Sequence, residues 1–200
     1  IEKLHNHNIL KQIIPNISGT KSFQTIIQIE NKVNDPNIFA FRSIRRLAAL
    51  MDFDCSQTEE ISTALNLSKT EIHYLAQLAS LIKKVNINLK KADLTRILYK
   101  YSKIALIDSI LVKYSKQYST VRNQLVPREK DWLRIIEIIR TINEDTLVFP
   151  LKGQDAINLG IPAGPQISKF LKLTEVWWLT KGCRATRDEC LSKLRYLINK

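Results

Sequence analysis

Apolar residues recur every three to four positions along most of this chain, which is the spacing of one buried face of an α-helix. The clearest patterns cover residues 69–82, 103–114 and 165–178. No segment alternates apolar and polar residues over the length of a strand, and five glycines and six prolines are few for a turn-rich β fold. The sequence therefore predicts an all-α fold, an array of short helices without a sheet.

Local signals place several helix ends. Ser68 and Glu71 have the spacing of a capping box, and Asp35 followed by Pro36 marks another helix start. Shorter patterns predict the remaining helices, over residues 1–15, 22–32, 37–51, 92–98, 132–142 and 154–159, with two more opening at Thr58 and Thr186. The first pattern is already under way at Ile1, so we expect the chain to be a piece of a longer protein.

The region from 149 to 191 has the most distinctive punctuation. Gly160 stands where a C′ glycine closes the short helix 154–159, because glycine adopts a positive φ without a Cβ penalty. Residues 161–164 then form a tight loop, and Pro165 takes the first position of the next helix. The sequence thus predicts a tail that resembles a helix–hairpin–helix.

A glycine-punctuated loop that opens a helix presents backbone N–H groups at the positive end of the helix dipole, and this arrangement binds phosphate. Lys152, Lys169 and Lys172 flank the loop. Two interpretations stay open from the local pattern. The segment either grips a nucleic-acid backbone or is an αα-corner that only turns the chain.

The net charge of +12 is unevenly distributed. Residues 1–82 are balanced, whereas residues 83–122 carry ten basic and two acidic side chains, and residues 149–200 carry nine and four. Solvated lysines normally alternate with acids, so a block of this density favours a polyanionic partner, nucleic acid above all.

Four tyrosines lie among the lysines of the first basic block: Tyr99, Tyr101, Tyr114 and Tyr118. Aromatic rings interleaved with cations can stack on the bases of a nucleic acid. Tyrosines can equally cover the edges of a core while lysine stems lie over them. Both interpretations remain open at this stage.

Other chemistries find little support. Three cysteines without a C-x-x-C pair predict neither a disulfide framework nor a zinc site, and they fit a reducing cytoplasm. Asp52 and Asp54 have the spacing of a nucleotidyltransferase metal pair, but no strand or glycine-rich loop accompanies them, so they are not predicted to be catalytic. The histidines His5, His7 and His73 are interpreted as solvated or satisfied residues rather than metal ligands. No apolar run is long enough to span a membrane.

Several motifs in the tail are familiar. They are F-P-L-K-G-x-D (149–155), L-G-I-P-x-G-P-x-I (159–167), a glutamate before Trp-Trp at 175–178, and E-C-L at 189–191. This pattern resembles the C-terminal part of bacterial tRNA nucleotidyltransferases, the CCA-adding enzymes and their poly(A) polymerase relatives. The run R-L-A-A-L from Arg46 is similar to the same family. Ala163 and Ser168 depart from it, since the family often has proline and glycine there.

The resemblance implies a division into the end of a neck (1–35), a helical body (36–122) and a helical tail (123–200). It implies tRNA as the partner, held at its T arm and elbow while a catalytic head, absent here, adds or repairs the 3′ CCA end. Mg²⁺ and ATP or CTP would belong to that head, so no cofactor is expected in this chain. The head could be supplied separately, and the chain alone would be inactive.

No catalytic or metal-ligating residue is assigned, because the only match to the family's nucleotide-selecting E-D-x-x-R begins at Glu144 and lacks the arginine. The predicted RNA-binding residues come from the two basic blocks and the hairpin: Lys83, Lys84, Lys90, Lys91, Arg96, Lys100, Lys103, Lys152, Gly160, Gly164, Lys169 and Lys172. An alternative hypothesis is a non-enzymatic helical module that binds nucleic acid or protein after loss of the head.

Overall fold

The structure is a computed structural model. It describes residues 1–6, 9–14, 17, 20–33, 40–51, 58–120 and 129–199. Throughout these residues the regular elements are helices, and the only β pairing is an isolated bridge between Ile17 and Met51. The predicted all-α array is therefore confirmed. The described chain forms two compact units, of which unit 1 comprises residues 1–89 and 101–140 and unit 2 comprises residues 90–100 and 141–200.

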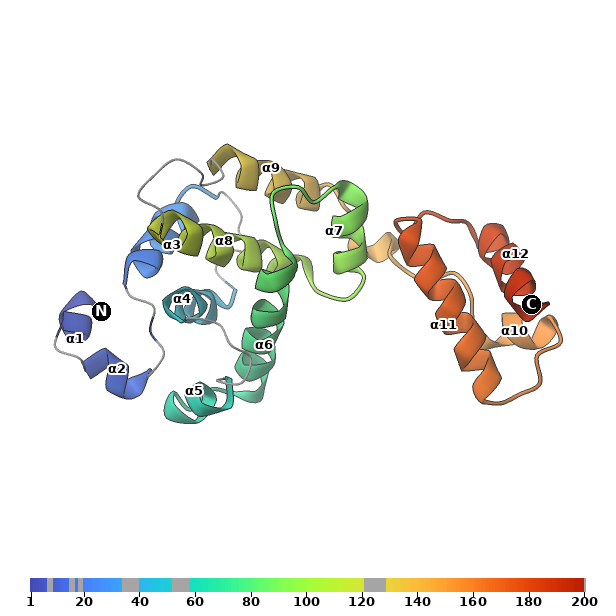
Figure 1. Cartoon of the computed structure of the whole chain (residues 1–200), viewed down its shortest axis with the longest axis horizontal. Helices are drawn as coiled ribbons and strands as arrows, with labels where there is room; N and C mark the ends of the chain where they lie inside the picture. Colours follow the sequence, from blue (N-terminus) through green and yellow to red (C-terminus); the bar gives the residue numbers. More distant parts are fainter. Residues whose placement is uncertain are drawn as a thin grey trace. The chain divides into compact units, whose positions relative to one another are not determined.

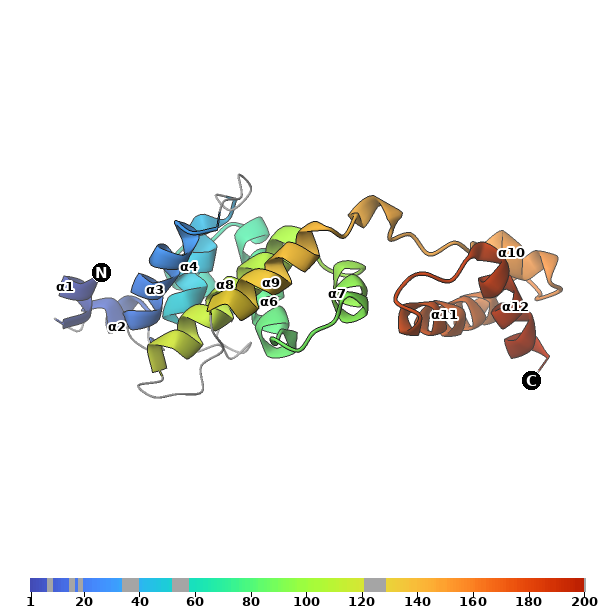
Figure 2. The same cartoon turned by 90° about the horizontal axis from the view of Figure 1, so that it is seen from above.

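Unit 1 is a helical array around one central helix (Figure 1). Its helices are α1 (Glu2–Asn6), α2 (Ile9–Ile13), α3 (Lys21–Glu30), α4 (Arg42–Leu50), α5 (Thr58–Ala64), α6 (Lys69–Lys84), α8 (Lys103–Thr120) and α9 (Glu129–Arg140). Helix α8 packs against α3, α4, α6 and α9, and the two views in Figures 1 and 2 both show α9 alongside it.

The sequence of α8 explains its central position. Apolar side chains occur on every side of it, and the buried ones are Ala105, Leu106, Ile107, Ile110, Leu111, Val112 and Tyr114. A helix that is hydrophobic all round is stable only when other helices enclose it. The predicted helix 103–114 is thus confirmed, and it extends to Thr120, with Ser115 also buried and its hydroxyl donating to the carbonyl of Val112.

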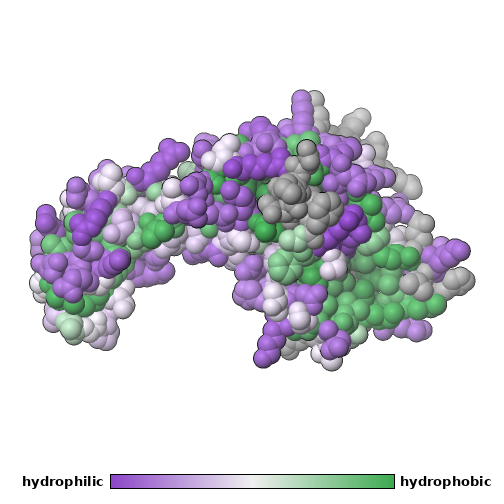
Figure 3. All heavy atoms as spheres, turned by 180° about the vertical axis from the view of Figure 1, so that it is seen from behind, coloured by the Kyte–Doolittle hydropathy of each residue, from purple (hydrophilic) through white to green (hydrophobic). Residues whose placement is uncertain are grey.

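Two helix predictions in unit 1 need correction. Among the described residues, the helix predicted over residues 1–15 is found as two short helices, α1 and α2, and the side chains of Ile9 and Ile13 in α2 are 42% and 41% exposed. Hydrophobic side chains indeed gather on one face of unit 1 in Figure 3.

The helix predicted over 37–51 begins only at Arg42 among the described residues. Phe41 precedes it with φ of 53° and stacks on Tyr74, their ring centroids 4.0 Å apart. The left-handed backbone at Phe41 stops the helix from extending further toward the N-terminus. The predicted break at Asp35 and Pro36 lies outside the described residues.

A buried ionic cluster lies beneath α4. Arg45 is fully buried, and its guanidinium contacts Glu30 of α3 at 2.9 Å and Asp108 of α8 at 2.7 Å. Tyr74 of α6 donates a 2.8 Å hydrogen bond to the other oxygen of Asp108, and Arg46 pairs with Glu30 at 2.7 Å. The cluster ties four helices of unit 1 together, since each buried charge finds its partner on a different helix.

Unit 2 contains α7 (Lys91–Leu98), the 3₁₀ turn η3 (Glu144–Thr146), α10 (Gly153–Asn158), α11 (Pro165–Thr180) and α12 (Arg187–Ile198). Its core consists of Leu151, Ala156, Ile161, Trp178, Cys190 and Leu194. Helix α11 packs against both α10 and α12. The helices predicted at 154–159, from Pro165 and from Thr186 are confirmed, and Thr186 caps α12 by accepting from the Glu189 N–H at 3.3 Å.

Helix α7 lies in sequence between two helices of unit 1 but packs within unit 2. The Tyr99 ring, at its C-terminal end, meets the Trp178 ring edge-on with centroids 5.3 Å apart. The predicted domain boundaries, after residues 35 and 122, fall outside the described residues and stay predictions. Among the described residues, no helix is long and apolar enough to cross a membrane.

Candidate nucleic-acid interface

The predicted hairpin is built as the glycine spacing indicates. The Gly160 N–H donates to the Ile157 carbonyl at 2.9 Å and the Ile161 N–H donates to the Ala156 carbonyl at 3.2 Å. This pair of bonds is a Schellman motif, which requires the positive φ of 90° found at Gly160. Ile161 then turns inward and is 4% exposed, so the corner is anchored in the core of unit 2.

The start of α11 is open to solvent. Gly164 is its N-cap, Pro165 occupies the first helical position, and neither a side-chain cap nor an acidic residue occupies the first turn. A Cβ built at Gly160 or Gly164 would meet no atom within 4 Å. Residues 162–166 are also exposed, so an anion can approach the backbone at the start of this 16-residue helix.

Two lysines at the hairpin have exposed side chains, Lys152 before α10 and Lys169 in the second turn of α11. The backbone N–H of Lys152 donates to Asp155 at 2.7 Å, and the other carboxylate oxygen of Asp155 pairs with Arg187. The charge of Asp155 is thus balanced by Arg187 of α12. Asp155 therefore does not offset the positive charges of Lys152 and Lys169.

Lys172 is differently placed, because its ammonium binds Glu175 at 2.6 Å. Tyr99 donates to the other oxygen of Glu175 at 2.5 Å. Burial would raise the pKa of Glu175, but the hydrogen bonds from Lys172 and Tyr99 and the charges of Lys172 and Lys100 outweigh burial and lower it. Lys100 from the first basic block and Lys172 from the second therefore meet around one ionised carboxylate.

The remaining predicted cations of unit 2 belong to α7. Lys90, Lys91 and Arg96 are exposed, and Arg96 forms an ion pair with Asp93 one turn earlier. The Lys90 N–H donates to the Asp93 carboxylate at 3.0 Å. The Asp93 carboxylate thus caps α7 and pairs with Arg96, while the side chains of Lys90 and Lys91 are exposed to solvent.

Three predicted residues, Lys83, Lys84 and Lys103, lie in unit 1. The Lys84 ammonium donates to the Tyr101 hydroxyl at 2.8 Å and is 4.8 Å from the centroid of that ring. The predicted RNA-binding set is consequently divided between the two units, with nine of its twelve residues in unit 2: Lys90, Lys91, Arg96, Lys100, Lys152, Gly160, Gly164, Lys169 and Lys172.

Part of the first basic block serves the fold. The Lys113 ammonium donates to the carbonyls of Ile82 and Val85 at 2.9 and 2.6 Å, and Lys116 donates to the carbonyl of Met51. Burial lowers the pKa of Lys113. These two ammonium groups donate to carbonyls near helix ends. Fewer than ten basic side chains of the first basic block are therefore left to contact a nucleic acid.

The structure decides between the two interpretations of the tyrosines. Tyr114 is 4% exposed and lies 6.3 Å, centroid to centroid, from Trp132. Tyr99 and Tyr101 hold the hydrogen bonds described above, and Tyr118 alone of the four is mainly exposed, at 57%. Tyr99 and Tyr114 therefore pack against core tryptophans, as the second interpretation stated, whereas Tyr101 is half-buried beneath Lys84 and Tyr118 presents the most exposed ring of the four.

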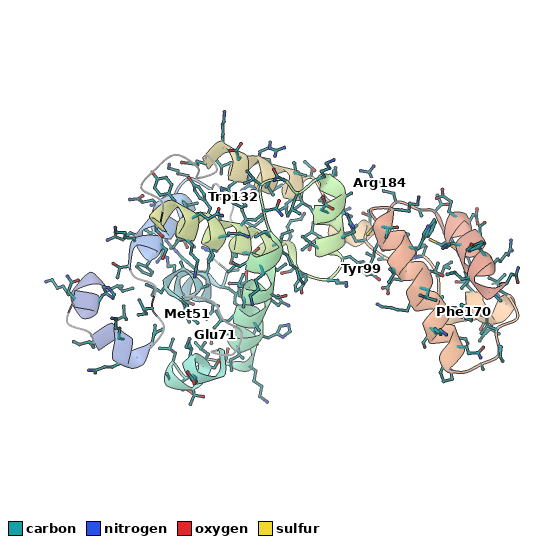
Figure 4. The ribbon with its side chains drawn as sticks, in the orientation of Figure 1. Met51, Glu71, Tyr99, Trp132, Phe170 and Arg184 are labelled. Carbon is teal, nitrogen blue, oxygen red and sulfur yellow. The ribbon has the colours of Figure 1, made fainter. Side chains whose placement is uncertain are left out.

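Sequence reasoning missed a groove of about 660 Å³ between the end of α11 and the start of α12. Its main side chains are Trp177, Lys181, Arg184, Asp188, Glu189 and Lys193. Figure 4 places Arg184 just beyond the end of α11, with Phe170 further back along that helix. The one available signal was the four-residue spacing from Trp177 to Lys181, which places a cation over an aromatic ring on a helix.

Among the residues that the structure describes, no group of three or more His, Cys, Asp or Glu could hold a metal ion. Glu144 and Asp145 lie in η3. Asp52 and Asp54 lie outside the described residues. The hairpin combines exposed lysines with an open backbone, an arrangement that can bind an anion.

No family model, curated protein or solved structure matches this chain. The resemblance to tRNA nucleotidyltransferases therefore stands on the motifs alone. Those motifs coincide with the elements just described, since L-G-I-P-x-G-P spans the hairpin and E-C-L holds the N-terminal turn of α12.

Proposed function

We propose that this chain is the tRNA-binding C-terminal part of a tRNA nucleotidyltransferase. In this role it holds the T arm and elbow of tRNA by charge and shape, while a separate catalytic head carries out nucleotidyl transfer. The head would hold Mg²⁺ and ATP or CTP, and this chain would contribute position rather than catalysis. The chain alone is expected to transfer no nucleotide.

The observation that carries the proposal is the hairpin between α10 and α11. Its backbone is open at Gly160 and Gly164, its second helix begins without a side-chain cap, and Lys152 and Lys169 extend from its two sides. Contacts of this kind go to phosphate and carry no base information. A protein that accepts every tRNA needs such contacts, because all tRNAs share a backbone shape and differ in sequence.

The second support is the neutralisation of acids at this interface. Asp155 is paired with Arg187, and Glu175 is shared by Lys172 and Tyr99 while Lys100 acts on it electrostatically. Carboxylates that would repel phosphate are thus held by cations of the protein. The remaining lysines determine the field that an approaching RNA meets.

The test is a competition between folded tRNA and a perfect RNA duplex of the same number of nucleotides, each bound to the full chain at the same salt concentration. We expect tRNA to bind more tightly by on the order of tenfold or more, because the protein recognises a bent, L-shaped surface rather than charge alone. A variant with Lys83, Lys84, Lys90 and Lys91 all changed to Glu is expected to lose most of this binding.

Equal affinity for tRNA and duplex would contradict the tRNA proposal and leave general polyanion binding. Absence of binding to either at low salt would favour the alternative, a non-enzymatic helical module with a protein partner. Circular dichroism of the quadruple-lysine variant separates loss of binding from loss of fold.

A further inference from the structure

The groove at the other end of α11 combines an aromatic ring with three cations. Trp177 packs part of its indole against the core of unit 2 and leaves the rest exposed. The Lys181 ammonium lies 5.8 Å from the Trp177 ring centroid, near the outer limit of a cation–π contact. Trp177 is half-buried and lines the groove, so a flat ligand in the groove can reach its ring.

The cations of the groove are held by a well-defined turn. Helix α11 ends in a second Schellman motif, in which the Gly182 N–H donates to Leu179 at 3.0 Å and the Cys183 N–H donates to Trp178 at 3.2 Å. The indole N–H of Trp178 then donates to the carbonyl of Ala185 at 3.1 Å. Arg184, whose own side chain is exposed, is therefore fixed on both sides by bonded backbone.

The cations of the groove outnumber its acidic residues, three to two. Glu189 accepts the Thr186 N–H at 2.7 Å and so caps α12. Asp188 lies beside it in the first turn of α12, where the helix dipole favours a negative charge. Lys181, Arg184 and Lys193 all line the groove, and the Lys193 ammonium lies 4.7 Å from the centroid of the Tyr196 ring.

We infer that this groove binds a nucleotide, with the base stacked on Trp177 and the phosphate held by Lys181, Arg184 and Lys193. A volume of about 660 Å³ accommodates a base, a sugar and a phosphate. The aromatic face favours a nucleotide over an acidic peptide, since carboxylates need the cations but not the ring. The groove shares no residue with the hairpin, so this site does not rest on the proposed function.

The ligand could be a free nucleoside phosphate or an unpaired nucleotide of an RNA, and two probes separate these sources. Fluorescein-labelled single-stranded hexaadenylate is titrated into the full chain and followed by anisotropy, and AMP is added as a competitor. Displacement by AMP at concentrations comparable to the hexamer shows a mononucleotide site. Binding of the hexamer that AMP does not displace shows a site for a nucleotide within RNA.

Two variants decide whether the groove is the site. Trp177→Leu keeps an apolar contact with the core but removes the stacking face, and we expect hexaadenylate to bind about tenfold more weakly. Arg184→Glu changes an exposed cation, and we expect a loss of similar size. Lys11→Glu, an equal change of charge on exposed α2 of unit 1, is the matched control and is expected to change affinity less than twofold.

Binding that neither Trp177→Leu nor Arg184→Glu weakens would overturn the inference, as would equal displacement by hexaglutamate. If Trp177→Leu unfolds by circular dichroism, Arg184→Glu remains decisive because its side chain is exposed. Failure here would leave tRNA binding through the hairpin untouched, since that depends on other residues.

Discussion

The Tyr99 hydroxyl donates a 2.5 Å hydrogen bond to Glu175, joining the end of α7 to the middle of α11. Burial raises the pKa of Tyr99 to about 12, and the Glu175 charge adds to this effect, so the phenol stays protonated and keeps donating. Figure 4 labels Tyr99 at the C-terminal end of α7. This contact explains why a segment that lies between two helices of unit 1 in the sequence belongs to unit 2.

Changing Tyr99 to Phe should loosen α7. The variant keeps the ring contact with Trp178 but leaves one oxygen of Glu175 without its donor, and we expect the opening free energy of α7 to fall by about 1 kcal/mol. Hydrogen exchange of the α7 amides measures it. Tyr196→Phe is the control, because that side chain is 57% exposed. Unchanged protection in α7 would show that the aromatic contact alone holds the helix.

The ionic cluster of unit 1 should make stability depend on pH. Burial raises the pKa of Asp108 to about 6, although Arg45 and Tyr74 oppose the shift. Asp108 then binds its proton more tightly in the folded than in the unfolded protein. Its contribution to stability is complete below pH 4 and is lost as pH rises through 6. Burial would raise the pKa of Glu30, but Arg46 and Arg45 lower it, so its contribution is lost instead as pH falls below its usual range.

Urea unfolding of the wild type and of Asp108→Asn at pH 4 to 8 tests this. We expect the wild type to lose on the order of 2 kcal/mol relative to the variant between pH 4 and pH 7, because only the wild type carries the titrating carboxyl. A wild-type advantage that grows with pH would instead show that the Arg45 charge outweighs burial.

Two glycines with positive φ should respond differently to alanine. A Cβ at Gly160 meets open space, whereas at Gly182 it would lie 3.1 Å from the Cβ of Ala92 on α7. We expect Gly160→Ala to cost about 1 kcal/mol from backbone strain alone, and Gly182→Ala to cost about twice that. Thermal unfolding of the two variants gives the comparison. Equal losses of stability in the two variants would mean that α7 moves away from the new methyl group at residue 182 without losing stability.

Local chemistry predicted several helix ends well. Gly160 and Pro165 place the hairpin by backbone sterics alone, and the Ser68 capping box is confirmed by bonds of 2.9 and 3.3 Å with Glu71. These features depend on neighbours within five residues. A single sequence can therefore reveal them without knowledge of the tertiary fold.

Features that depend on distant partners were not predictable. Arg45 looks like a surface residue of an amphipathic helix, yet it is fully buried because Glu30 and Asp108 reach it from other helices. Lys113 was counted as part of a basic surface, yet it binds carbonyls at the end of α6. In the candidate site the hairpin could be predicted, whereas the pairing of Lys172 with Glu175 and Tyr99 could not.

We propose that the hairpin of unit 2 grips an RNA backbone. The most direct test is to measure the affinity of the full chain for tRNA as a function of salt concentration. Three proteins are compared: the wild type, the hairpin variant Lys152→Glu/Lys169→Glu, and the matched control Lys3→Glu/Lys11→Glu. We expect a steep wild-type slope of log affinity against log salt, a slope lower by about two in the hairpin variant, and an unchanged slope in the control. Equal changes in the two variants would contradict the claim, because binding would then follow net charge and not the hairpin.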